Sequence, residues 1–115
     1  MGETIQFVGL SELEQLEQDK INSLVTKYLE KIRRLIYNIS LIHIHIKQYK
    51  KKETNSKYVL VVKVSIPKKT FEAEKSDWDL PKATHLCFEA LINEIQHYLG
   101  AENVKFMKKS SKNKS

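Results

Sequence analysis

Two segments near the middle of the chain alternate apolar and polar residues with the period of two that is typical of β-strands. Residues 40–49 read SLIHIHIKQY, and residues 58–66 read YVLVVKVSI. Successive side chains on a strand point to opposite faces, so Ile42, Ile44 and Ile46 should share one face. The second segment is rich in β-branched residues, which favour strands. We therefore expect a sheet with one apolar face and one polar face.

Two shorter segments predict further strands. Residues 4–8, TIQFV, alternate in the same way, and residues 69–74, KTFEAE, place Phe71 and Ala73 on the apolar side. A polar stretch at 50–57, KKKETNSK, is expected to form the connection between the two long strands. The chain should thus contain four strands.

Apolar residues at helical spacing predict a helix over about Leu16 to Ile36, with a start nearer Glu12 as the alternative. Ser11 and Glu14 have the spacing of a capping box at its N-terminus.

A second helix should follow the last strand. Asp77 or Asp79 can cap it, and Pro81 falls in its first turn, where a missing N–H costs little. Gly100 is expected to end it.

This order predicts an α+β fold, β-α-β-β-β-α, with a four-stranded mixed sheet. The first strand–helix–strand unit should make its two strands parallel, and the remaining strands should form antiparallel hairpins. Each strand has one apolar face, so both helices should pack on the same face of the sheet. We expect one domain over residues 1–100 and a basic, disordered tail at 101–115, which is low in complexity from about Lys108 onward.

The charge distribution favours an acidic partner. The net charge is +6 with a pI near 9.4, and residues 31–69 contain only one acidic residue, Glu53, among many cations. Such a block suits nucleic acid or an anionic membrane surface. No apolar run has the length of a membrane span, and the N-terminus lacks the features of a secretory signal. A cytoplasmic protein with no membrane partner is therefore expected.

The sequence offers little to enzyme chemistry. His43 and His45 would lie on the same side of a strand and could supply two ligands of a zinc site, but a third ligand is missing. Exposed histidines beside lysines are the preferred interpretation. Cys87, the only cysteine, falls among apolar residues and suits the core. We predict no catalytic activity, no metal, no cofactor and no small-molecule substrate.

Binding to RNA suits the cations better, because lysines on a sheet face and in a connection can follow phosphates. Tyr49 and Tyr58 flank the lysine-rich stretch and either stack on bases or serve as ordinary hairpin residues. The predicted RNA-binding residues are Lys27, Lys31, Arg34, His43, His45, Lys47, Lys50, Lys51, Lys52 and Lys63.

One long segment resembles a known family. Residues 64–99, VSIPKKTFEAEKSDWDLPKATHLCFEALINEIQHYL, resemble the second half of the ribosome hibernation-promoting factors, also called ribosome-associated translation inhibitors or sigma-54 modulation proteins. The resemblance is carried by the strand end at 71–74 and by Asp79-x-x-x-Ala83 opening the helix. Residues 24–28, LVTKY, are similar to the family's first helix.

The resemblance implies a protein that binds small-subunit rRNA in the decoding channel, occludes the mRNA and tRNA sites, and catalyses no reaction. It would be a short form without a dimerisation domain, monomeric away from the ribosome. Where the family usually has Lys or Arg on the second helix, this chain has Ala90, Asn93 and His97. RNA contacts should therefore shift to the first helix, the lysine-rich stretch and the open sheet face. The alternatives are a generic double-stranded RNA-binding domain and a non-enzymatic protein-interaction module.

Overall fold

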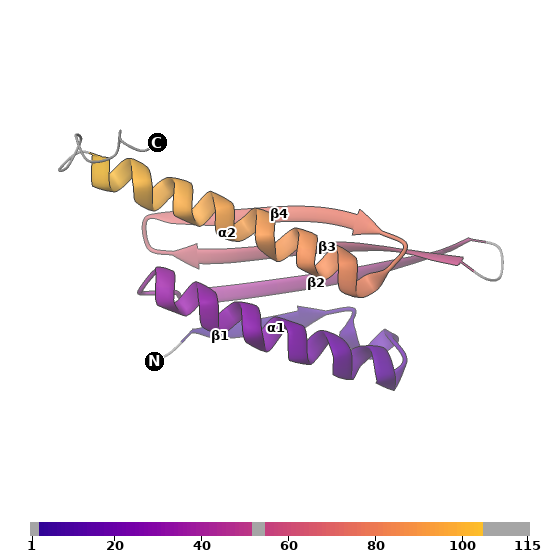
Figure 1. Cartoon of the computed structure of the whole chain (residues 1–115). Helices are drawn as coiled ribbons and strands as arrows, with labels where there is room; N and C mark the ends of the chain where they lie inside the picture. Colours follow the sequence, from indigo (N-terminus) through magenta and orange to yellow (C-terminus); the bar gives the residue numbers. More distant parts are fainter. Residues whose placement is uncertain (1–2, 52–54, 105–115) are drawn as a thin grey trace.

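A four-stranded sheet forms one layer of the protein and two helices form the other (Figure 1). The structure, a computed structural model, describes residues 3–51 and 55–104. The elements in chain order are β1 (Thr4–Val8), the short 3-10 helix η1 (Leu10–Glu12), α1 (Gln15–Leu35), β2 (Leu41–Lys51), β3 (Asn55–Ile66), β4 (Lys69–Asp77) and α2 (Leu80–Val104). The predicted α+β class, with its β-α-β-β-β-α order, is confirmed.

The strands lie in the order β1-β2-β3-β4, so the sheet follows the chain from one edge to the other. β1 runs parallel to β2, with Thr4 opposite Leu41. The β2–β3 and β3–β4 pairs are antiparallel. The mixed sheet expected from the sequence is therefore the one observed.

The core lies on one side of this sheet. Ile42, Ile44 and Ile46 of β2 are buried, whereas His43 and His45 between them are only partly buried. Both helices send apolar residues to the same side of the sheet. The helical contribution to the core comprises Ile21, Val25, Tyr28, Leu29 and Ile32 from α1 and Leu80, Cys87, Phe88, Leu91, Ile92 and Ile95 from α2.

The β2–β3 hairpin is longer than predicted, and the expectation of a polar connection over 50–57 was wrong. β2 continues to Lys51 and β3 begins at Asn55, opposite each other in the register. Backbone hydrogen bonds between paired strands need no apolar face, so polar residues can continue the ladder. The hairpin extends beyond the ends of the neighbouring helices (Figure 1). Lys52 lies outside the described residues.

The predicted bounds of α1 agree with the observed Gln15–Leu35, but its predicted capping box and the predicted end of α2 are wrong. Ser11 lies inside η1, and the N-cap of α1 is Glu14, which makes no side-chain capping hydrogen bond, so there is no capping box. α2 continues through Gly100 to Val104. A glycine in a helix costs about 1 kcal/mol relative to alanine, which the surrounding helix can tolerate.

The predicted start of α2 is confirmed. The Asp79 side chain accepts a hydrogen bond from the backbone N–H of Lys82 at 3.3 Å, and Asp77 accepts one from the N–H of Asp79 at 2.9 Å. Pro81 occupies the first turn. These two aspartates fix the point at which β4 turns into α2.

Gly9 is required at the end of β1. Its φ of 91° lies in the left-handed region, and a Cβ at this position would be 2.0 Å from the carbonyl oxygen of Ile46. Only a residue without a side chain allows the chain to leave β1 this close to β2.

The one-sided core leads to a matched pair of mutations on β2. Ile44→Ala should reduce the free energy of unfolding by about 2–5 kcal/mol, because Ile44 is fully buried. His43→Ala, one residue away on the open face, should cost no more than about 1 kcal/mol. Urea denaturation of both variants measures the difference. Equal losses would contradict the assignment of faces.

Candidate nucleic-acid interface

The open face of the sheet carries a row of polar side chains that crosses all four strands. His43 of β2 lies opposite Gln6 of β1 and Lys63 of β3, and Lys63 lies opposite Glu72 of β4. Nδ1 of His43 is 3.1 Å from Oε1 of Gln6. Because Oε1 of Gln6 can only accept a hydrogen bond, Nδ1 of His43 carries the proton in this contact. Nε2 of the same ring points away from Gln6.

His45 lies beside His43 on the same face, with ring centroids 6.2 Å apart and rings nearly perpendicular. Lys47 follows two residues later on the same strand and is half-buried. The imidazoles and the ammonium groups of Lys47 and Lys63 therefore belong to one surface, as the alternation predicted.

This surface is not uniformly cationic. The outward side chains of β4 include Glu72 and Glu74, both exposed, and β4 forms an edge of the sheet. The open face thus has imidazole and ammonium groups on β2 and β3 and carboxylates along β4. An RNA backbone would follow the β2 side and avoid the β4 edge, because phosphates are repelled by carboxylates.

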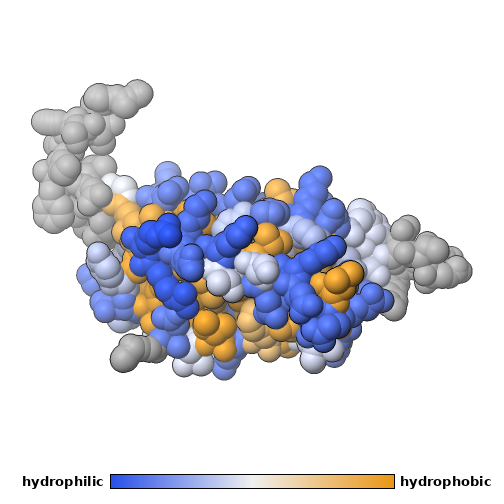
Figure 2. Space-filling model, turned by 60° about the horizontal axis from the view of Figure 1, so that its bottom comes forward, coloured by the Kyte–Doolittle hydropathy of each residue, from blue (hydrophilic) through white to orange (hydrophobic). Residues whose placement is uncertain are grey.

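A second cationic surface lies on the helix layer. Lys27, Lys31 and Arg34 are exposed on α1 and, three and four residues apart, share one side of the helix. They border a groove of about 350 Å³ between α1 and α2. Figure 2, turned so that the side of α1 and β1 comes forward, shows this side as mainly hydrophilic, with smaller hydrophobic areas between. This groove is lined by Leu24, Lys27, Tyr28, Glu30, Lys31, Arg34 and His85.

Tyr28 forms the floor of this groove and connects the two helices. Its hydroxyl is 2.6 Å from Nδ1 of His85, and its ring stacks on Phe88 with centroids 5.0 Å apart. The ammonium group of Lys31 lies 5.9 Å from the centre of the Tyr28 ring. Burial, followed by the negative charge of Glu89, raises the pKa of Tyr28. The phenol therefore stays neutral and holds α1 and α2 at a fixed distance.

The predicted RNA-binding residues therefore divide between opposite sides of the sheet. Lys27, Lys31 and Arg34 gather on the helix layer, and the open face carries His43, His45, Lys47 and Lys63. The backbone of Lys50 and Lys51 belongs to β2. Sequence reasoning did not find Tyr28 and His85, which are brought together only by helix packing.

The two tyrosines beside the hairpin have different surroundings. Tyr49 is 55% exposed, whereas Tyr58 is 7% exposed and its hydroxyl donates to Oε2 of Glu17 at 3.0 Å. Burial and this hydrogen bond raise the pKa of Tyr58. Of the two alternatives that the sequence leaves for Tyr58, stacking on bases does not fit, since its ring belongs to the core.

The outward side of α2 offers few cations. Glu89 and Glu94 are exposed there, together with Asn93 and His97, and Ala90 is half-buried. α1 and β2 therefore present more cationic and imidazole groups to a polyanion than the outward side of α2 does.

Cys87 is a core residue, as predicted. It is fully buried, and its Sγ lies 3.4 Å from the carbonyl oxygen of Leu60 and 3.3 Å from that of Ala73. Burial raises the pKa of Cys87 to about 12. A thiol that is neither ionised nor accessible is a poor nucleophile.

Within residues 3–51 and 55–104, no group of three or more His, Cys, Asp or Glu side chains is placed to hold a metal ion. In the same part of the chain, no helix is both long and apolar enough to cross a membrane.

The fold is shared with two solved structures of other proteins. A ribosomal subunit interface protein from Coxiella burnetii superposes with a TM-score of 0.58 at 21% identity, covering 84% of this chain and 98% of that one. The N-terminal domain of Protein Y from Thermus thermophilus gives a TM-score of 0.62 at 19% identity, covering 85% and 99%. At such identities the likeness establishes the fold.

Sequence comparison then identifies the family. Residues 17–102 match the family described as sigma 54 modulation protein / S30EA ribosomal protein. The comparison with curated proteins finds no match. Because the family match spans most of the sequence, the chain belongs to this family of non-enzymatic, ribosome-associated hibernation factors and translation inhibitors. Family membership agrees with the prediction that the chain is not an enzyme.

The raised pKa of Cys87 predicts a pH effect on stability. The unfolded thiol ionises near its ordinary value of 9.0, whereas the folded thiol ionises near 12. Between these values the unfolded state binds fewer protons, so the stability that this thiol contributes falls as the pH rises, by roughly 1.4 kcal/mol per unit.

Urea denaturation between pH 8 and about 10.5 should show that the free energy of unfolding falls more steeply with pH for the wild type than for Cys87→Ala. The cavity left by the alanine lowers stability by an amount that does not depend on pH, so the two slopes remain comparable. Identical slopes would contradict a buried, neutral thiol.

Proposed function

We propose that this protein binds the small ribosomal subunit through rRNA in the decoding channel and there occludes the sites of mRNA and tRNA. The observation that carries the proposal is family membership over residues 17–102. The proposed setting is the cytoplasm, and the proposed state away from the ribosome is a monomer. No chemistry on a substrate is involved.

The charge distribution supports this function. Cations lie on both layers: Lys27, Lys31 and Arg34 on α1, and Lys47 and Lys63 on the open face. RNA that lines a channel on more than one side can contact both layers at once. A single RNA duplex beside the domain can contact only one of the two layers. We propose His43, His45 and the hairpin lysines 50–52 as additional contacts on the sheet side.

A second candidate function is a protein-interaction module. It is favoured by exposed carboxylates, Glu72 and Glu74 on the β4 edge of the open face and Glu89 and Glu94 on α2, which could receive a cationic protein partner. A complex that survives nuclease treatment would support this candidate.

Neutralising the α1 cations tests the proposal. The triple substitution Lys27→Gln, Lys31→Gln and Arg34→Gln should weaken binding to purified small subunits, because cations that bind phosphates release counterions from the RNA. The slope of log K against log salt should fall in magnitude by roughly 0.7 to 0.9 for each phosphate that the variant no longer neutralises. Co-sedimentation across a salt series measures both quantities.

The matched control removes the same charge elsewhere: Lys20→Gln, Lys68→Gln and Lys69→Gln, three exposed positions outside the proposed contacts. It should have a smaller effect on affinity and slope. Equal effects of the two triple substitutions would contradict a specific α1 contact and indicate non-specific attraction. Equally tight binding to isolated RNA duplexes would instead favour the generic double-stranded RNA binder.

A further inference from the structure

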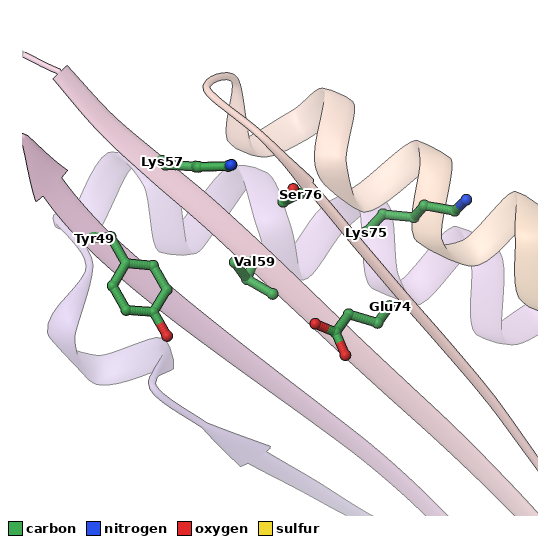
Figure 3. Close-up of a pocket in the computed structure, with 6 residues that line it drawn as sticks. All are labelled: Tyr49, Lys57, Val59, Glu74, Lys75 and Ser76. Atoms are coloured by element: carbon green, nitrogen blue, oxygen red, sulfur yellow. The ribbon is translucent and has the colours of Figure 1, made fainter.

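A hollow of about 500 Å³ lies on the sheet near the β2–β3 hairpin, apart from the α1 groove (Figure 3). Three neighbouring strands contribute to it, and the acidic edge strand β4 forms one wall. The lining residues are Tyr49, Lys57, Val59, Glu74, Lys75 and Ser76.

The strand register sets the order of these side chains. Tyr49 of β2 lies opposite Lys57 of β3, Val59 lies opposite Ser76 of β4, and Glu74 lies opposite Val61. Val59 is therefore placed between the ring of Tyr49 and the carboxylate of Glu74, as Figure 3 shows. The hollow has an aromatic ring at one end, an apolar floor and a carboxylate at the other end.

The groups around the hollow are of both charges. Glu74 is exposed, and among the described side chains it has no hydrogen-bond or ion-pair partner. Lys57 supplies an ammonium group and Ser76 a hydroxyl on this face, whereas Lys75, opposite the core residue Leu60 in the register, directs its ammonium group to the helix side of the sheet. A simple anion would be repelled by Glu74, and a simple cation by Lys57.

A nucleotide satisfies this combination. Its base offers a flat surface to Tyr49 and Val59, its N–H groups can donate to a carboxylate, and its phosphate can bind the ammonium group of Lys57. Among the bases, guanine presents two adjacent donors, N1–H and the N2 amino group, which match the two oxygens of one carboxylate. Adenine and cytosine each offer only one amino group on the corresponding edge.

We propose that this hollow binds one unpaired guanine nucleotide, with the base on Tyr49 and Val59, the N1–H and N2–H groups donating to Glu74, and the phosphate at Lys57. The inference rests on the proposed function, because it names a base-reading site in an RNA-binding surface that is otherwise built from phosphate contacts.

Trp78, the only tryptophan, provides a probe. It is 53% exposed, and the ammonium group of Lys57 lies 5.9 Å from its ring. A phosphate that draws Lys57 away from this ring should change the tryptophan emission and the NMR signal of the indole N–H. The readout is therefore independent of ribosome binding.

The experiment titrates the full chain with guanosine, inosine and adenosine 5′-monophosphates and follows Trp78 and the backbone amides of 49, 59 and 74 by NMR. Guanosine monophosphate should bind about tenfold more tightly than the other two, since a bidentate contact of this kind contributes roughly that discrimination. Inosine lacks the N2 amino group, so its weaker binding identifies the second hydrogen bond.

Glu74→Gln should abolish the preference for guanine, because the amide can accept only through one oxygen. Glu72→Gln is the matched control: it changes the same charge on the same exposed strand, opposite Lys63 and outside the hollow. It should leave the preference unchanged. Tyr49→Ala should weaken the binding of all three nucleotides to a similar extent.

Equal binding of the three nucleotides, or an unchanged preference in Glu74→Gln, would overturn the inference, as would amide shifts confined to other surfaces. These results are separable from the proposed function. Subunit binding that persists in the wild type while the hollow shows no preference contradicts only the guanine site. Loss of subunit binding by the wild type contradicts the proposed function, whatever the nucleotide titration shows.

Discussion

The burial of one face of the sheet under two helices is the constraint on which the rest of this structure depends. Ile44 of β2 and Val62 of β3 lie opposite each other and are fully buried. Because side chains alternate, each buried position forces its neighbours outward. His43, Lys63 and Glu74 owe their places on the open face to this register, and a shift by one residue would bury their charges. The packing of the core therefore determines which side chains lie on the open face of the sheet.

The thinness of the molecule makes both of its layers available to one partner. Its smallest extent is 20 Å, and cations lie on the helix side and on the sheet side. A partner that surrounds the protein can contact both layers, which suits a channel within a large RNA assembly better than an isolated duplex.

The sequence alone predicted the order of the elements and the division of the sheet into two faces, because both depend on the local periods of two and 3.6 residues. It could not predict contacts between distant residues. Tyr28 meets His85 and Tyr58 meets Glu17 only because the helices pack on the sheet. The sequence places Tyr58 beside the hairpin, whereas packing brings its ring into the core.

The ends of elements were also poorly predicted, for two reasons. The hairpin extends through polar residues, since paired backbone groups at Lys51 and Asn55 stabilise it without an apolar pattern. Gly100 does not stop α2, because a glycine permits a left-handed end but does not impose one. From the sequence, Glu74 is expected to be only a solvent-exposed strand residue. Its proposed role depends on Tyr49 and Val59, which the sheet places beside it.

The most direct measurement of the central claim is competition on purified small subunits. Labelled mRNA carrying a start codon and its tRNA are bound first, and this protein is then added at increasing concentration. Occlusion of the decoding channel predicts that both RNAs are released as the protein saturates the subunit at a ratio near one. Subunits that retain mRNA and tRNA while fully occupied by the protein would contradict the account.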